Sequence, residues 1–350
     1  MTVPAAQKAI SIDSLKAFAA NLLVAGGYAA DYAAQTAELL VWANARGIDS
    51  HGVMRIPRYL EMVQLGQLKG RAEPRFVSSF GATSVLDADL APGAVGMNLA
   101  VNNAVELARK LGIAWCAARN ITHAGAVGYF AEKVAAAGQI GIVMTASKPL
   151  MSYFGAKAEG VSTNPVAICA PNPAGRPLLL DMSTSAAALG KIMAAKEAGK
   201  SIPVGWGVEA SGADTTDPAA VKFLLPMAGA KGSGLSLMIE VLSSVLVGNP
   251  LIARALAGDG KGAFNGLVIA LNIAAFGDAA AFANDMADLA KAIKALPKAD
   301  GTEEILLPGE RGYQAASEAQ TKGVQLEAAT ARKLCQLAVA LGVAVPASLQ

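Results

Sequence analysis

Apolar residues recur at the spacing of an α-helix through the first 66 residues of the chain. Capping residues and glycines divide this stretch into expected helices: one capped by Ser11 and ended by the glycine pair 26–27, one from Asp31 to Gly47, and one from Asp49 or Ser50 to Gly66. The links between them are short. We therefore expect a helical domain that begins with residues 1–75.

After residue 75 the pattern changes to short apolar runs separated by turns. The runs that predict strands are 84–86, 113–118, 140–146, 166–170, 178–180 and a returning strand at 264–275. Helical patterns lie between and after them, at 94–111, 129–137, 235–247 and 326–341. This alternation predicts a mixed α/β fold. We expect a helical domain of residues 1–75 with 227–260 and 313–350, beside a mixed α/β domain of residues 76–226 with 261–312.

The composition narrows the class of protein. Apolar residues make up 53% of the chain, charged residues 16%, and the net charge is +2. The apolar content supplies a large core and argues against disorder, while the small charge and the lack of a basic run argue against a nucleic-acid partner. The apolar runs are shorter than the roughly 18 residues of a membrane span, and charged residues interrupt the N-terminus. We therefore expect neither a membrane segment nor a signal peptide.

Cysteine and histidine usage bears on the compartment and on metal binding. Cys116, Cys169 and Cys335 stand far apart, so we expect them to be reduced and buried, as in the cytoplasm. His51 and His123 are the two histidines of the chain. A metal site rich in histidine is therefore not expected.

The common phosphate-binding motifs are missing from the sequence. No G-x-G-x-x-G is present, and Gly199-Lys200-Ser201 resembles the end of a P-loop except that Ala194 stands where the first glycine is needed. Neither H-E-x-x-H nor G-x-S-x-G occurs. Spacing rules alone lead no further than an α/β protein, with an enzyme favoured.

The strongest cluster of candidate chemistry is the segment 49–59. On a helix that starts at Ser50, the side chains of His51, Arg55 and Tyr59 lie one turn apart on a single face. An imidazole transfers protons near neutral pH, and a guanidinium binds a carboxylate through two hydrogen bonds. The pair suits a substrate with a carboxylate beside a carbonyl. A helix start with a partly buried histidine and a surface arginine explains the pattern equally well.

Other stretches place polar side chains in expected loops or at helix starts. They are Thr122–Tyr129, Ser162–Pro165, Leu180–Ser185 and Ala230–Gly234. A lysine and glycines at a helix start can bind a phosphate through free N–H groups. A structural histidine, ordinary turns and a helix start also account for these stretches, and each is weak by itself.

Taken together and in this order, the stretches resemble the second type of malate/L-lactate dehydrogenase. This family also includes ureidoglycolate, sulfolactate and diketogulonate oxidoreductases and a branch that reduces cyclic imines. The resemblance covers residues 11–345. It is carried by Ala45–Gly47, Ser50–Arg55, His123–Gly125, Thr163–Pro165, Asp181–Ser185, Gly190–Ile192, Ile202–Pro203, Gly205–Trp206, Thr215–Pro218, Lys231–Gly232 and Leu307–Glu310.

The resemblance implies a fold, a cofactor and a reaction. The fold is a non-Rossmann, NAD- or NADP-binding domain with a mixed sheet plus a helical domain, like L-sulfolactate dehydrogenase, and this explains the missing glycine motif. The reaction is hydride transfer between NAD(P)H and a small 2-oxo acid. A homodimer whose subunits complete each other's sites is implied, with no nucleic-acid or membrane partner. No pair of arginines stands out as a clamp for a 2′-phosphate, so NAD is favoured over NADP.

The resemblance also implies roles for individual residues. His51 would be the proton donor, supported by Ser50, with His123 as the second candidate. Arg55, with Tyr59 and Thr163, would bind the substrate. The residues on cofactor-contacting stretches are Ser147, Asp181, Met182, Ser183, Lys231, Gly232, Glu310 and Arg311.

Two further functions stay open beside 2-oxo acid reduction. One is a different enzyme, a cyclic ketimine carboxylate reductase or a ureidoglycolate dehydrogenase. Lys191 stands where the imine-reducing branch has an aspartate, which favours carbonyl chemistry. The other is a binding protein of the same fold that has lost turnover. The set of His51, Arg55, His123 and Lys231 argues against that alternative.

Overall fold

A mixed sheet of seven strands forms the centre of the computed structural model, which describes residues 8–197, 199–259 and 264–350. The strand order is β2 (Arg75–Phe80), β3 (Thr83–Asp87), β4 (Ile113–Ile121), β12 (Phe264–Asn272), β5 (Gln139–Ala146), β8 (Val166–Ala170) and β9 (Leu178–Met182). Within the described residues β3 and β4 are parallel and the other neighbours in this sheet are antiparallel. A doubly wound dinucleotide fold has mostly parallel strands. The predicted non-Rossmann α/β fold is therefore confirmed.

Small side chains allow helices to pack closely on one face of this sheet. α4 (Gly93–Leu111) and α5 (Gly128–Ala136) cover that face, and their alanines share a core with Ala114, Cys116 and Ala118 of β4. A Cβ on Gly141 of β5 would lie 2.7 Å from Val134 of α5. The small alanine side chains thus allow the helices to pack close to the sheet.

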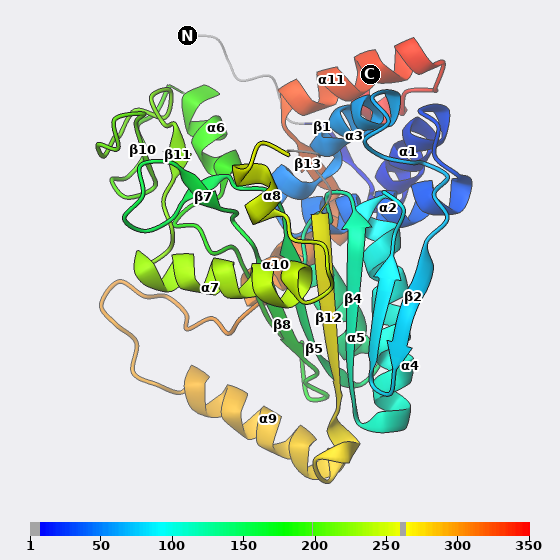
Figure 1. Cartoon of the computed structure of the whole chain (residues 1–350), viewed down its shortest axis with the longest axis vertical. Helices are drawn as coiled ribbons and strands as arrows, with labels where there is room; N and C mark the ends of the chain where they lie inside the picture. The colour runs from blue at the N-terminus through cyan, green and yellow to red at the C-terminus, as the bar shows by residue number, and fades with distance from the viewer. Residues whose placement is uncertain (1–7, 198, 260–263) are drawn as a thin grey trace.

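Among the described residues, the elements that cover the opposite face of the sheet lie at its two ends. α7 (Ala230–Glu240) and the π-helical η3 (Val241–Val245) pack on β5 and β12 near one end. α9 (Ala279–Lys294) follows β12 and the short helix η4 (Ile273–Ala275) at the other end. Figure 1 shows the strands open to the viewer between α7 and α9.

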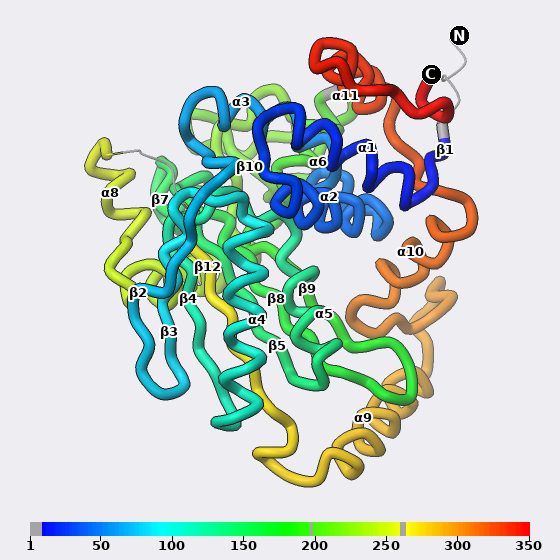
Figure 2. The backbone as a smooth tube through the Cα atoms, turned by 90° about the vertical axis from the view of Figure 1, so that its right-hand side faces the viewer, coloured from blue at the N-terminus to red at the C-terminus, as the bar shows by residue number. Residues whose placement is uncertain are grey.

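A second core joins the two ends of the chain. It is built from the helices α1 (Ile12–Ala25), α2 (Ala30–Ala45), α3 (Ile56–Gln64) and α11 (Ala328–Leu341), with the strand pair β1 (Lys8–Ile10) and β13 (Val324–Leu326). α10 (Glu310–Lys322) packs on α2, and η5 (Ala347–Leu349) lies on β1. Figure 2 shows α1, α2 and α11 together at one end of the molecule.

A small sheet forms a third unit beside the large one. Its order is β10 (Gly207–Val208), β11 (Phe223–Leu224), β6 (Met151–Ser152) and β7 (Glu159–Val161). α6 (Leu189–Glu197) and α8 (Ile252–Leu256) pack beside it, and Met151, Val161, Ile192 and Ile252 share its core.

Most expected elements are present, with shifted boundaries. Ser11 caps α1 by accepting the N–H of Ser14 at 3.2 Å, as predicted. The prediction that Asp31 caps α2 is wrong, because the helix already begins at Ala30. The expected strand 264–275 ends at Asn272. The domain boundaries stay a prediction; α7, which we grouped with the helical domain, packs on the large sheet.

Two expectations from composition can be compared with the fold. Cys116, Cys169 and Cys335 are free, and the first two are buried. Within the described residues, no helix is both long and apolar enough to cross a bilayer.

Candidate active site

The candidate site lies at one edge of the large sheet, where it meets the helical core. β4, β5 and β9 run in one direction, and the strands between them, β12 and β8, run in the opposite direction. The carboxyl ends of the first three therefore lie at the same end of the sheet as the starts of β8 and β12. His123 follows β4, Ser147 follows β5, Ser183 follows β9 and Thr163 precedes β8. The topology therefore brings four of the predicted loops to one edge.

The two histidines stack on each other across the junction of the two cores. His51 comes from the helical side, in the short helix η1 (Asp49–His51), and His123 comes from the sheet. Their ring centroids are 5.6 Å apart and the rings are inclined by 22°. Both side chains are partly buried. The prediction that both belong to one site is consistent with this geometry.

A buried asparagine determines the path of the His51 segment. Asn44 on α2 donates to the Asp49 carboxylate at 2.5 Å and accepts the N–H of Val53 at 2.8 Å. A Cβ on Gly52 would lie 2.2 Å from the Asn44 Oδ1, so the segment can approach only as glycine. The expected helix from Ser50 is therefore wrong: the chain makes two short 3₁₀ turns, and α3 begins at residue 56.

Arg55 is held beside the histidines without an acidic partner. Its Nε donates to the Ser50 carbonyl oxygen at 2.6 Å, which turns the side chain back towards η1. The residue is partly buried. The ion pairs formed by the described residues do not include Arg55. A cation in this position attracts an anion from solution.

Each imidazole is oriented by a hydroxyl at its Nδ1 atom. The Ser50 Oγ lies 3.0 Å from Nδ1 of His51, and the Tyr59 Oη lies 2.8 Å from Nδ1 of His123. The Phe264 ring packs edge-on against His123 at 5.6 Å and 82°. These contacts leave the Nε2 atom of each ring for another group. Tyr59 is buried behind His123, so its predicted contact with substrate has no direct support here.

Burial and positive charge keep both imidazoles neutral. Burial, together with the smaller effect of the nearby Arg55 charge, lowers the pKa of His51 from 6.5 to about 4. For His123, burial lowers the pKa well below its usual range, and Arg55 and His51 add to the effect. Burial raises the pKa of Tyr59, so its hydroxyl stays protonated. Near pH 7 the site thus contains one cation, Arg55, and two neutral proton acceptors.

A chain of backbone hydrogen bonds joins the other predicted loops. The N–H of Thr184 donates to Thr163 O at 3.3 Å, that of Met227 to Thr184 O at 2.9 Å, and that of Gly232 to Met227 O at 2.9 Å. Ser147 is tied to the same region, because its Oγ lies 2.5 Å from the Ser162 Oγ. The loops containing Thr163, Ser183 and Lys231 therefore form one continuous surface.

The start of α7 has the properties of a phosphate site. A Cβ on Gly232 would lie 2.3 Å from Met227 O, so only glycine lets the helix start here. Lys231 is exposed beside it. The Thr184 Oγ1 is buried without a hydrogen-bond partner among the described residues. An exposed lysine in the first turn of a helix is one feature of a phosphate site, so Lys231 and Gly232 stay predicted cofactor contacts.

Asp181 connects the end of β9 to the segment that follows His123. Its carboxylate accepts the N–H of Gly128, the first residue of α5, at 3.0 Å. Surrounding protein raises the pKa of this carboxyl from 3.8 to about 6, although part of the side chain stays accessible to solvent. Of the neighbouring predicted residues, Met182 ends the strand and the Ser183 Oγ lies 2.9 Å from the Ser185 Oγ.

The remaining predicted cofactor residues lie at the start of α10. Glu310 accepts the N–H of Leu307 at 2.8 Å and pairs with Lys294 at 2.9 Å, while Arg311 is exposed. Gly309 packs on Leu179 of β9. Within the described contacts, nothing joins Glu310 or Arg311 to the histidines.

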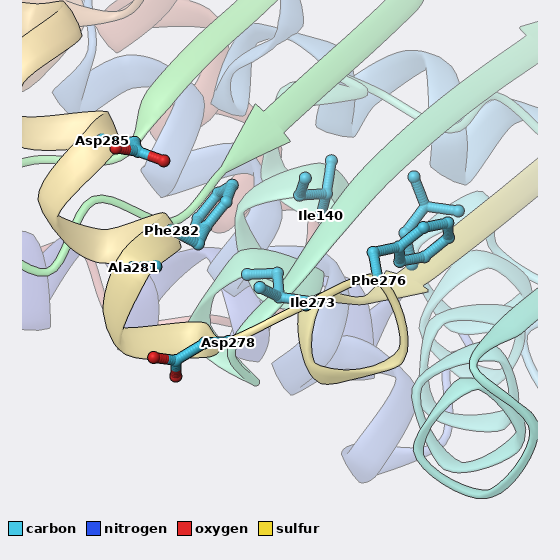
Figure 3. Close-up of a pocket in the computed structure, with 9 residues that line it drawn as sticks. Ile140, Ile273, Phe276, Asp278, Ala281, Phe282 and Asp285 are labelled. Carbon is cyan, nitrogen blue, oxygen red and sulfur yellow. The ribbon is translucent and has the colours of Figure 1, made fainter.

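A cavity of about 410 Å³ lies at the other end of the sheet. Figure 3 shows Ile140, Ile273, Phe276 and Phe282 around it. Neither histidine lines it, and its lining side chains are mainly apolar. This cavity is therefore separate from the candidate site.

Sequence reasoning missed two residues that shape the site. Asn44 interrupts the apolar face of α2, and a buried amide within a helix was the available signal. Phe264 opens β12, and nothing local in its sequence indicated a contact with His123.

Comparisons with known proteins agree with the resemblance found in the sequence. A family model described as malate/L-lactate dehydrogenase matches residues 10–335. Ureidoglycolate dehydrogenase (NAD(+)) of Escherichia coli is 34% identical, covering 91% of this chain and 92% of the relative. Delta(1)-pyrroline-2-carboxylate reductase of Ancylobacter novellus is 32% identical, covering 91% and 94%. The crystal structure of malate dehydrogenase from Entamoeba histolytica has a TM-score of 0.92 at 26% identity, covering 97% of this chain and all of that one.

The charge of Arg55 can be tested as the second cause, after burial, of the low His51 pKa. Replacing Arg55 with Gln removes the repulsion, so the His51 pKa should rise from about 4 towards 6.5. NMR titration of the His51 ring measures the shift. Arg58→Gln, which alters an exposed arginine paired with Glu61, is the matched control and should leave the His51 pKa unchanged. Equal His51 pKa values in wild type and Arg55→Gln would contradict this account.

Proposed function

The chain belongs to the malate/L-lactate dehydrogenase family and is a nicotinamide-dependent oxidoreductase of hydroxy and oxo acids. On this basis we propose that it reduces a small 2-oxo acid to the 2-hydroxy acid, with NAD preferred over NADP. The observation that carries the proposal is the partly buried Arg55, which has no acidic partner among the described residues and lies beside two neutral imidazoles. A 2-oxo acid supplies what this arrangement lacks: a carboxylate for the guanidinium and an adjacent oxygen for an imidazole.

The proposed roles follow from the contacts of each side chain. Arg55 binds the carboxylate in both directions of the reaction, because the charge is present throughout. In oxidation, the Nε2 of His51 accepts the hydroxyl proton, since Ser50 occupies its Nδ1 side. In reduction, the bound carboxylate offsets the charge of Arg55 and raises the His51 pKa, so that the imidazole can carry the proton to the forming alkoxide.

His123 and Thr163 complete the proposed substrate site. His123 is the second candidate for proton transfer, and Tyr59 acts through it by holding its Nδ1. Thr163 lies on the loop before β8, with its carbonyl already used by Thr184. Its side chain is partly exposed and is proposed to contact substrate.

The proposed cofactor surface runs along the loops after β5 and β9 and the start of α7. Ser147, Asp181, Met182, Ser183, Lys231 and Gly232 would hold the dinucleotide, with Glu310 and Arg311 at its margin. The nicotinamide supplies or accepts the hydride when bound. Arg311 is the single arginine of this set, and a 2′-phosphate clamp commonly needs more positive charge, so NAD is preferred.

A cyclic ketimine carboxylate is the alternative substrate class. One relative bears the name of a pyrroline-2-carboxylate reductase, and such a substrate also has a carboxylate for Arg55. A Cβ on Gly190 would lie 2.7 Å from the Ser50 Cβ, so the start of α6, with Lys191, packs beside the Ser50–His51 pair. A cation there disfavours the iminium form of a substrate, which supports carbonyl chemistry.

A substrate panel tests the proposed function. NADH and NADPH are each combined with pyruvate, oxaloacetate, branched 2-oxo acids and piperideine-2-carboxylate, and ureidoglycolate is offered with NAD⁺. We expect an open-chain 2-oxo acid to give the highest kcat/KM, and NADH to exceed NADPH. A panel led by the cyclic imine would replace our proposal with the alternative, and no turnover of any acid would favour a binding protein.

Substitutions at Arg55 and His51 should separate binding from proton transfer. Arg55→Ala removes a charge-assisted contact worth about 2–5 kcal/mol, so kcat/KM should fall roughly 30- to several-thousand-fold, mostly through KM. His51→Asn keeps a polar side chain without a titrating proton and should lower kcat about 10²–10⁴-fold with little change in NADH affinity. Steady-state kinetics and cofactor fluorescence measure both effects. Near-normal kcat in His51→Asn with a collapse in His123→Asn would transfer the proton role to His123.

We also propose a homodimer that covers the open face of the large sheet. Five large apolar side chains form one cross-strand row on this face: Trp115, Ile269, Ile142, Ile168 and Leu180. The last two are 37% and 39% exposed in the isolated chain. Apolar faces of this extent are usually covered, and a second copy of the chain offers a matching surface through a twofold axis.

The size of the face is appropriate for an interface between subunits. Five strands at about 4.8 Å spacing and five residues of about 3.3 Å give a flat area of roughly 400 Å². Exposed apolar side chains of the flanking elements, Leu237 and Met238 of α7 and Leu289 and Ile293 of α9, extend it. A stable complex buries roughly 800 Å² per partner, so the proposal requires the flanking elements to supply the area beyond the row.

A charge placed in the centre of the row should dissociate this dimer. Ile168→Lys puts an ammonium group where the partner would pack, so light scattering at micromolar concentration should change from dimer to monomer, with unchanged far-UV circular dichroism. The control is Val339→Lys, because Val339 is 77% exposed on α11, a helix of the helical core that does not belong to the large sheet. A monomeric wild type, or a mutant that stays dimeric, would remove this face as the interface.

A further inference from the structure

Backbone strain is concentrated beside the predicted loops. The described residues other than glycine with positive φ are Asp89 (52°), Leu90 (60°), Asn120 (56°) and Ala228 (49°). The first three surround the end of β4, directly before His123, and the fourth precedes the start of α7. Such conformations cost free energy and persist only where the surroundings enforce them. The end of β4 is therefore held by specific contacts.

The strain at Asn120 marks a β-bulge. β12 pairs with β4 so that Phe264 faces Ile121 and Gly266 faces Ala118, which leaves two residues of β4 opposite Asn265. Asn120 is one of the two and adopts the left-handed conformation that asparagine tolerates. A bulge turns the strand that follows it. Here it sets the direction in which β4 leaves the sheet towards His123.

Three asparagine side chains enforce this bulge. Asn265 is fully buried, and its Oδ1 accepts the backbone N–H of Asn120 at 3.1 Å and the Nδ2 of Asn249 at 2.9 Å. The Nδ2 of Asn249 also donates to the Oδ1 of Asn120 at 3.0 Å, and the Nδ2 of Asn265 donates to Asn249 O at 2.8 Å. The amides of this asparagine cluster (Asn120, Asn249 and Asn265) thus bond to one another.

The cluster is anchored on both sides of the strand. Asn120 Nδ2 donates to both carboxylate oxygens of Asp87 at 3.2 Å, and Arg119 pairs with the same carboxylate at 3.1 Å. On the other side, Arg254 donates to the Asn249 Oδ1 at 3.2 Å. The cluster therefore ties β3, β4, β12 and the segment after η3 together.

His123 lies at the end of this arrangement. Phe264, which pairs with Ile121 beside the bulge, packs its ring edge-on against the His123 ring. A Cβ on Gly93 would lie 2.3 Å from His123 O, so α4 starts in direct contact with the histidine backbone. A change in the bulge would move Phe264 and the His123 backbone together.

We propose that the cluster of Asn120, Asn249 and Asn265 is a positioning device for His123, which holds a strained bulge so that His123 and Phe264 are directed into the site opposite His51. The proposal rests on the proposed function only in giving His123 a place in the reaction. None of the described side-chain hydrogen bonds of the cluster reaches a predicted substrate- or cofactor-contacting residue, so its effect on activity passes through His123.

The experiment uses the two histidines of the chain as probes. Asn120→Gly retains the left-handed backbone but removes the amide, and Asn249→Ala removes the central donor without altering β4. Asn103→Ala is the matched control, because Asn103 on α4 accepts one hydrogen bond, from Ser84 of β3, away from the site. Ring spectra of ¹⁵N-histidine-labelled protein, assigned with His51→Asn and His123→Asn, report each imidazole without requiring turnover.

We expect both cluster variants to shift the His123 ring signals and to raise the His123 pKa towards its ordinary value, with a smaller change at His51. In the panel assay, kcat/KM should fall about 10–100-fold while NADH affinity stays near that of wild type. The control should match wild type in both measurements.

Unchanged His123 signals in folded Asn120→Gly and Asn249→Ala would overturn the proposal. The same holds if these variants lose only as much thermal stability as the control variant and show no change at His123. If wild type turns over no acid at all, the proposed function fails, while the ring spectra still decide whether the cluster positions His123.

Discussion

The site depends on the positive charge of Arg55. This side chain is partly buried and forms no ion pair with a carboxylate among the described residues. Its Nε is used by the Ser50 carbonyl, so the rest of the guanidinium is available to a ligand. The same charge adds to burial in keeping His51 and His123 unprotonated. An acidic residue beside Arg55 would stabilise its charge. It would also occupy the position proposed for a substrate carboxylate and raise the pKa values of both histidines. Under the proposed function, the carboxylate that this cation lacks among the described residues would be supplied by the substrate.

This arrangement exists only when the two large cores pack together, since each contributes one histidine. A cation at the end of α2 strengthens that junction. Arg46 pairs with Glu132 of α5 at 2.6 Å, and its guanidinium lies 4.4 Å from the Trp42 ring and 4.2 Å from the Tyr313 ring of α10. Trp42 Nε1 also donates to Glu132 at 2.7 Å. One ion pair with aromatic cover thus joins the helical core, the sheet helices and the C-terminal segment. The segment that carries His51 begins a few residues beyond this contact.

The parts of the structure that local patterns determine were predictable from the sequence, and those that depend on distant pairing were not. The strand at 166–170 was expected with the bounds it has, because a short apolar run between turns is a local signal. The helix expected from Ser50 failed because Gly52 is fixed by Asn44 on the preceding helix. The place of β12 between β4 and β5 could not be foreseen, since that strand comes much later in the chain. Phe264 was therefore missed as a neighbour of His123, and Asn265 as a neighbour of Asn120. The candidate site residues themselves were predicted from residue types that follow one another in the order typical of the family. That order can be read from the sequence even where the order of strands in the sheet cannot.

The sheet edge explains how a mostly antiparallel fold gathers its loops as a parallel one does. In parallel α/β sheets, ligands bind where the carboxyl ends of the strands meet. Here β4, β5 and β9 point the same way because an antiparallel strand lies between each successive pair, β12 between the first two and β8 between the last two. Their carboxyl ends consequently share an edge and present His123, Ser147 and Ser183 side by side. The intervening strands begin at that same edge, which adds Thr163 before β8 and Phe264 at the start of β12. An antiparallel strand between two parallel ones places its amino end beside their carboxyl ends. In a parallel sheet, every strand at that position would contribute its carboxyl end. The loops that carry the predicted site residues can therefore meet at one end of the sheet in a chain that lacks the glycine motif, because strand direction and not a turn after the first strand brings them together.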